Sequence, residues 1–220
     1  MTPRIALIHA LAHSLPPINA AFARDWPAAQ RMNLLDDSLS ADLARTGALD
    51  ARMTQRFLAL ADYAAGTGAQ AILFTCSAFG RCIEAVAQRH ASIPVLKPNE
   101  AMIDEAVALA AGTPIGLLAT FAPTLESMPP EFPAQAVLRS ALAEGAMAAL
   151  DAGDAQTHDR LAVQAAMRLA DQGCRVIALA QFSLARARDA VAAATGLPVL
   201  TTPDSAVRRL RQRLARAESL

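Results

Sequence analysis

Short apolar runs alternate along the chain with longer segments of helical periodicity. Residues 4–8, 32–35 and 71–74 are apolar runs of the length that buried strands have. Between the second and third runs, residues 50–65 carry apolar side chains at helical spacing, and Gly66 ends that pattern. Because strands and helices alternate, the pattern predicts an α/β protein with a parallel sheet covered on both faces.

The same alternation continues through the rest of the chain. The further elements that we expect are strands at 93–96, 115–119 and 176–180, helices at 155–170 and 206–217, and proline-containing loops at 16–17 and 123–133. The arginine-rich helix at the carboxyl end is expected to present its charges to solvent.

Two parts of the sequence resemble each other. Residues 68–77 align with residues 173–182, glycine on glycine and apolar run on apolar run. The Pro-Val-Leu segment that ends at Leu96 likewise aligns with the one that ends at Leu200. This internal repeat predicts two pseudo-symmetric α/β lobes, with an active site in the cleft between them. The expected first lobe is 1–97 plus 204–220, and the expected second lobe is 98–203.

Composition narrows the choice of partners. The 20 basic and 20 acidic side chains give a net charge of zero, and the pI is 6.9. Nucleic acid and anionic membrane surfaces are therefore not expected as partners. No apolar run has the length of a membrane span. The three cysteines are odd in number and lack the spacing of a disulfide framework, which favours a reducing, cytoplasmic location.

Cys76 is the first candidate for chemistry. It follows an apolar strand, stands between Thr75 and Ser77, and is placed where a helix is expected to begin. The helix dipole there would lower the thiol pKa and make Cys76 the most acidic of the three thiols. The alternative is that Cys76 is a small buried residue and Ser77 a helix cap. Cys82 and Cys174 are expected to be packing residues.

Other polar residues follow the predicted strands. His9 and His13 could carry a proton or donate a hydrogen bond, or could be ordinary loop histidines. His90 is expected at a helix end and His158 on a helix surface, and neither is assigned a role.

Three more side chains have an ordinary alternative to a functional role. Asp36 and Asp37 could form an acid/base pair or a metal site, but turn and capping chemistry explains them as well, and no histidine cluster accompanies them. Lys97 could meet an anionic substrate or lie on the surface. No glycine-rich phosphate loop is present, so no nucleotide is expected.

Residues 74–78, their repeat at 180–183, the loop at 120–124 and the segment at 203–205 together resemble the aspartate/glutamate/hydantoin racemase superfamily. The resemblance covers nearly the whole chain. It implies two Rossmann-like lobes that hold a small carboxylate between two cysteines. One thiolate removes the proton from the α-carbon, and the other thiol returns one to the opposite face. The resemblance implies neither a metal nor an organic cofactor.

The resemblance also implies roles for individual residues. Cys76 matches the catalytic cysteine of the first lobe, and the position of the second cysteine holds Gln181. An amide has no useful pKa, so Gln181 can form hydrogen bonds but cannot act as an acid or base. The expected substrate-binding residues are His9, Thr75, Ser77, Asn99, Thr120, Gln181 and Ser183.

These observations predict a cofactor-independent enzyme of the racemase or isomerase type. It would act through Cys76 at or next to the α-carbon of a small carboxylic acid. Two alternatives stay open: a one-cysteine decarboxylase of malonate-like acids, and a non-catalytic protein that binds small carboxylates. A homo-oligomer is compatible with the sequence.

Overall fold

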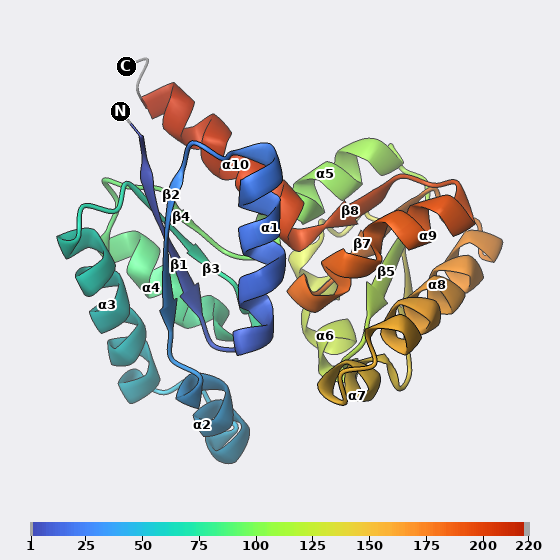
Figure 1. The fold of residues 1–220 in the computed structure, drawn as a ribbon, viewed down its shortest axis with the longest axis horizontal. Coiled ribbons are helices and arrows are strands. Elements are labelled where there is room, and N and C mark those ends of the chain that lie inside the picture. Colours follow the sequence, from blue (N-terminus) through green and yellow to red (C-terminus); the bar gives the residue numbers. More distant parts are fainter. Residues whose placement is uncertain (1, 218–220) are drawn as a thin grey trace. The chain divides into compact units, whose positions relative to one another are not determined.

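The protein, described by a computed structural model over residues 2–217, consists of two compact units, each built around its own parallel sheet (Figure 1). The first unit contains the residues up to 98 and those from 206 onward, and the second contains 99–205. These bounds differ from the expected lobes by at most two residues at each junction. Residues 1 and 218–220, which the expected first lobe includes, lie outside the described part.

The first unit has a four-stranded sheet in the order β2-β1-β3-β4, with all neighbours parallel. Its elements are β1 (Arg4–His9), η1 (Ala12–Ser14), α1 (Leu15–Asp25), β2 (Gln30–Leu35), α2 (Ser38–Thr46), α3 (Ala51–Gly66), β3 (Ala71–Phe74), η2 (Ser77–Phe79), α4 (Gly80–Arg89) and β4 (Val95–Leu96).

Helices cover both faces of this first sheet. Figure 1 shows α3 and α4 on one face and α1 on the other. The core under α3 and α4 contains three aromatic rings: Phe57 lies with its ring centroid 5.3 Å from that of Phe74 and 4.9 Å from that of Phe79. The central strands are buried on both faces, which explains why their sequences are continuous apolar runs.

The second unit has the same topology, with the strand order β6-β5-β7-β8. Its elements are α5 (Glu100–Ala110), β5 (Ile115–Ala119), α6 (Ala122–Ser127), η3 (Pro129–Glu131), β6 (Leu138–Leu142), α7 (Ala146–Asp151), α8 (Ala155–Asp171), β7 (Val176–Leu179), η4 (Phe182–Ala187), α9 (Arg188–Thr195) and β8 (Val199–Thr201). The last helix, α10 (Thr202–Ala217), begins in the second unit and continues in the first.

The strand registers of the two sheets match as the sequence repeat predicts. Ile72 on β3 pairs with Val95, and Ile177 on β7 pairs with Val199. In the second unit one buried cluster lies under α5 and another under α8 and α9, so this sheet too is covered on both faces. The expected fold class, α/β with two lobes on parallel sheets, is confirmed.

Some expected local structure was wrong. The two prolines at 16–17 do not form a loop but start α1, because proline is compatible with the first turn of a helix. The expected loop at 123–133 contains α6 and η3. Strand β6 was missed because it is an edge strand with half-exposed residues and no apolar run. His158, expected on a helix surface, is fully buried.

The lengths and the apolar content of the helices show whether any of them could cross a membrane. Within residues 2–217, no helix combines the length and the apolarity that crossing a membrane requires.

Gly116 on β5 allows a close contact between the second sheet and α8. A Cβ atom at this position would lie 2.8 Å from Ile177 Cδ1 and 3.1 Å from Leu169 Cβ. We therefore expect Gly116→Ala to lower the free energy of unfolding by about 1–3 kcal/mol through overpacking. Urea unfolding measures this, with Gly66→Ala as the control because a Cβ there meets nothing within 4 Å. Equal stability of Gly116→Ala and wild type would contradict the packing described.

Candidate functional site

In each sheet, two neighbouring central strands continue into helices on opposite faces of the sheet. We call the place between the carboxyl ends of these two strands the switch point. The chain leaves β1 toward α1 on one face and leaves β3 toward α4 on the other (Figure 1). In open parallel sheets, ligands bind at the carboxyl ends of two such neighbouring strands. In the first unit this point joins His9 with Thr75 and Cys76. In the second unit it joins Thr120 with Gln181.

Cys76 is partly exposed at the end of β3, and its pKa is not lowered as expected. Burial raises the pKa of the Cys76 thiol, while a hydrogen bond from the Ala78 backbone opposes that rise. Burial is the larger cause, and the expected dipole effect is small because Cys76 stands at the N-cap position of the three-residue 3₁₀ turn η2, with α4 beginning only at Gly80. A dipole effect that fades within the first helical turn gives Cys76 little stabilisation as a thiolate. The thiol is therefore protonated at neutral pH.

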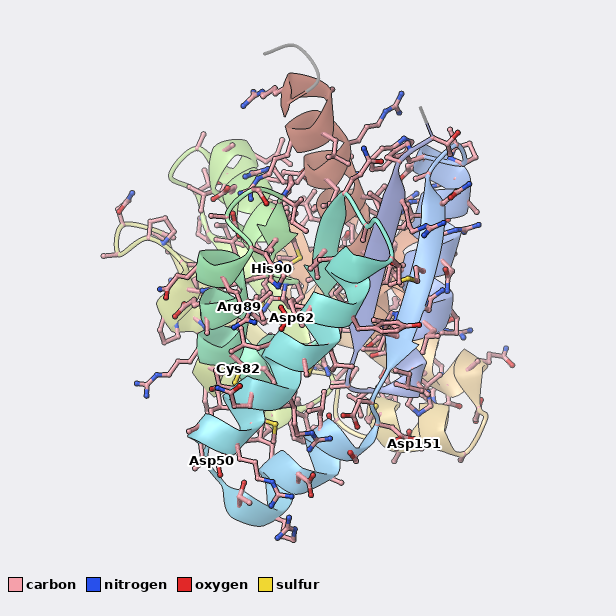
Figure 2. All side chains as sticks on the ribbon, turned by 90° about the vertical axis from the view of Figure 1, so that its left-hand side faces the viewer. Asp50, Asp62, Cys82, Arg89, His90 and Asp151 are labelled. Atoms are coloured by element: carbon pink, nitrogen blue, oxygen red, sulfur yellow. The ribbon has the colours of Figure 1, made fainter. Side chains whose placement is uncertain are left out.

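The other two cysteines are packing residues, as expected. Cys82 is 0% exposed and Cys174 is 2% exposed. Cys82 lies on α4 beside α3, where its sulfur is 3.6 Å from the Thr54 hydroxyl (Figure 2). Burial raises the pKa of both thiols.

Alkylation with iodoacetamide is expected to modify Cys76 first, because it alone of the three thiols is partly exposed. The rate should keep rising with pH beyond about 8.5, the ordinary thiol pKa, since burial raises the pKa of Cys76. Mass spectrometry of partially modified protein at several pH values measures both. Faster labelling of Cys82, or a rate that is already constant near pH 7, would contradict this description.

His9 is completely buried, and both its ring nitrogens have partners within the first unit. Nδ1 lies 2.9 Å from the Thr75 hydroxyl, and Nε2 lies 3.0 Å from Asn33 Oδ1. Burial lowers the pKa of His9, although the hydrogen bond with Asn33 raises it. The imidazole is therefore neutral at neutral pH. Asn33 is a residue that the sequence analysis missed, because only the strand register brings it to His9.

Thr120 fixes the side chain of Gln181. Gln181 Oε1 accepts hydrogen bonds from the Thr120 backbone amide at 2.6 Å and from its hydroxyl at 2.9 Å. A backbone amide can only donate, so the oxygen of the Gln181 amide must face Thr120. Its NH₂ group, with two donor hydrogens, faces away. Gln181 is thus oriented as a hydrogen-bond donor, and both donors of Thr120 are used to hold it.

The remaining expected site residues lie at the starts of helical segments. Ser77 begins η2, Ser183 is the second residue of η4, and both are half-buried. Asn99 precedes α5 and is 2% exposed. Its amide nitrogen is buried and has no hydrogen-bond partner among the described residues. An unpaired buried donor is costly, which makes Asn99 a candidate for binding an acceptor.

Asp36 has ordinary partners, whereas Asp37 stands at the N-cap position of α2, where its side chain forms no capping hydrogen bond. Arg56 donates to Asp36 at 2.6 Å, and Ser38 donates to the same carboxylate at 2.5 Å. Burial raises the pKa of Asp36, but these two partners outweigh it and lower the pKa overall. Lys97 forms a surface ion pair with Glu84. Over residues 2–217, no group of three or more His, Cys, Asp or Glu side chains is placed to hold a metal ion.

The fold and the two switch points define a double α/β protein with one candidate site at the strand ends of each sheet. The chain belongs to the Asp/Glu/Hydantoin racemase family, whose sequence model matches residues 12–210. No curated protein matches the chain in sequence.

Solved structures share this fold at low sequence identity. Glutamate racemase RacE1 from Bacillus anthracis has a TM-score of 0.73 at 14% identity, over 98% of this chain and 82% of that one. Allantoin racemase from Klebsiella pneumoniae has a TM-score of 0.74 at 18% identity, over 98% and 89% of the two chains. A glycine-to-cysteine mutant of arylmalonate decarboxylase has a TM-score of 0.67 at 18% identity, over 96% and 92%.

Proposed function

We propose that this protein is a cofactor-independent enzyme that transfers a proton to the α-carbon of a small carboxylic acid through Cys76. The observation that carries the proposal is the pair of switch-point residues. One position holds a partly exposed thiol whose pKa is raised by burial, and the equivalent position of the second sheet holds an amide. A protonated thiol is a proton donor, whereas Gln181 is neither acid nor base.

This pair favours one-thiol chemistry over racemisation by two cysteines. A carbanion, or its enediolate form, arises when an acid of the malonate type loses carbon dioxide. The electron pair of the broken carbon–carbon bond stays on the α-carbon and takes the proton of the Cys76 thiol. The resulting thiolate then recovers a proton from water. The decarboxylase alternative is therefore the reaction type that the protonated thiol supports best, within a family that also includes racemases.

Hydrogen-bond donors are required to stabilise the enediolate. The NH₂ group of Gln181 is such a donor, since Thr120 holds its oxygen turned away. The unpaired amide nitrogen of Asn99 and the half-buried hydroxyls of Ser77 and Ser183 are further candidates.

A substrate screen tests the proposal. Wild type and Cys76→Ala are incubated with aryl- and alkyl-malonates, hydantoins and acidic amino acids, and the products are followed by proton NMR and chiral chromatography. We expect turnover of at least one of these compounds by wild type, and turnover lower by about 10³-fold or more by Cys76→Ala. Binding of a small carboxylate without turnover of any would instead indicate a non-catalytic binding protein.

A further inference from the structure

A chain of hydrogen bonds leads from the start of α1 to the residue before Cys76. Asn19 Nδ2 donates to the Leu15 backbone carbonyl at 2.9 Å, and Asn33 Nδ2 donates to Asn19 Oδ1 at 3.4 Å. Asn33 Oδ1 then meets His9 Nε2 at 3.0 Å, and His9 Nδ1 meets the Thr75 hydroxyl at 2.9 Å. The chain joins α1, β2, β1 and the end of β3 within the first unit.

The direction of each bond follows from the fixed end of this chain. A backbone carbonyl can only accept, so the nitrogen of the Asn19 amide must face Leu15. The oxygen of Asn19 is then left to accept from the nitrogen of Asn33. That in turn leaves the oxygen of Asn33 to accept from His9, which requires a proton on Nε2.

His9 transmits this direction to Thr75. The imidazole is fully buried and neutral, so it carries one proton, and the proton on Nε2 leaves Nδ1 as an acceptor. The Thr75 hydroxyl therefore donates to Nδ1. The second acceptor near this hydroxyl is the Ile8 backbone carbonyl at 3.4 Å, which also lies inside the unit.

We infer that His9 and Asn33 are positioning residues that orient the Thr75 hydroxyl as a hydrogen-bond acceptor toward any ligand. Thr75, expected from the sequence to donate to a substrate carboxylate, then leaves that task to other groups. The atom that approaches Thr75 carries a hydrogen, as an amine, amide, ureide or hydroxyl group does. This statement about the ligand rests on the proposed function, whereas the orientation itself does not.

The side chains hydrogen-bonded to His9, directly or through Asn33, are neutral. Asn33 reaches it from β2 and Thr75 from β3, while Asn19 contributes from α1 through Asn33. Arg31 on β2 donates to the Asn19 backbone carbonyl at 2.8 Å. The Cys76 thiol follows Thr75 in sequence, and burial raises its pKa. Because residue 33 is hydrogen-bonded to His9, a negative charge introduced at position 33 would raise the pKa of the imidazole directly.

Nitrogen NMR of the histidine rings tests the orientation without any substrate. In wild type at neutral pH we expect the His9 proton on Nε2, and a proton on Nδ1 would overturn the inference. Asn33→Asp should raise the pKa of His9 by about 1 or more, because a carboxylate stabilises the imidazolium. His90, which pairs with Asp62, is the internal control, and its ring signals should be the same in wild type and Asn33→Asp (Figure 2). An unchanged His9 titration in a folded Asn33→Asp protein would also overturn it.

Calorimetric titration with malonate tests the consequence for binding. With Thr75 as an acceptor, Thr75→Val should change the malonate Kd less than about threefold, with Thr75→Ser as the matched control that keeps the hydroxyl. In the Asn33→Asp background, below the His9 pKa, His9 donates to Thr75 and frees the hydroxyl proton. Thr75→Val should then raise the malonate Kd about tenfold.

A tenfold rise of the malonate Kd on Thr75→Val in the wild-type background would overturn the inference. Failure of malonate to bind would count against the proposed function, and the ring-proton measurement alone would decide the inference.

Discussion

Replacement of Cys76 by alanine is expected to reduce turnover by about 10³-fold or more while the protein remains folded. The reason is that the proposed reaction has one group that can deliver the proton, and alanine removes it. The kcat of the variant on the best substrate of the screen measures this, with circular dichroism to establish that the fold is intact.

The chain offers two matched controls for this substitution. Cys82→Ala and Cys174→Ala remove buried thiols that have no proposed role in catalysis, and both variants should keep the wild-type kcat where they fold. Cys76→Ser keeps the size of the side chain but replaces the thiol by a hydroxyl. Because a hydroxyl is a weaker acid than a thiol, this variant should also have little activity. Wild-type turnover by Cys76→Ala would exclude Cys76 as the proton donor.

Replacement of Gln181 by cysteine is expected to create racemase activity. In the proposed function Cys76 is the one acid/base group at the α-carbon, and racemisation needs a second. A second thiol at position 181 would supply the missing acid/base group. We expect the rate of racemisation of a compound that wild type protonates to increase on the order of 10²-fold. Chiral chromatography of an enantiopure compound measures the rate.

Gln181→Ser is the control for this experiment, because serine matches cysteine in size and has no useful pKa near neutrality. It should not racemise the compound. If wild type already racemises it as fast as Gln181→Cys does, position 181 is not where an acid/base group is missing, and wild type does not use one thiol alone.

The central strands could be predicted from the sequence because burial on both faces leaves an apolar run. The run at 71–74 and the one at 176–179 are fully buried strands in the structure. β6 could not be predicted in this way, since an edge strand needs few apolar residues. The start of α1 was missed because its two prolines are equally typical of a loop.

The candidate site shows the same division between local and long-range information. The sequence placed Cys76 after a strand, but the burial that raises its pKa depends on tertiary packing, and the apolar pattern does not distinguish an α-helix from the 3₁₀ turn that follows. The link of His9 to Asn33 depends on how β1 and β2 are paired. The link of Thr120 to Gln181 likewise depends on the pairing of β5 with β7. Strand registers of this kind are set by tertiary packing.

In the proposed reaction one thiol delivers the proton to the α-carbon, and turnover in deuterated water shows whether it does. The substrate is a malonate with two different substituents on its α-carbon, so that the product is chiral. We expect one deuteron on the α-carbon of the product and a single configuration, seen by mass spectrometry and chiral chromatography. A racemic product from wild type, or a product without deuterium at the α-carbon, would contradict it.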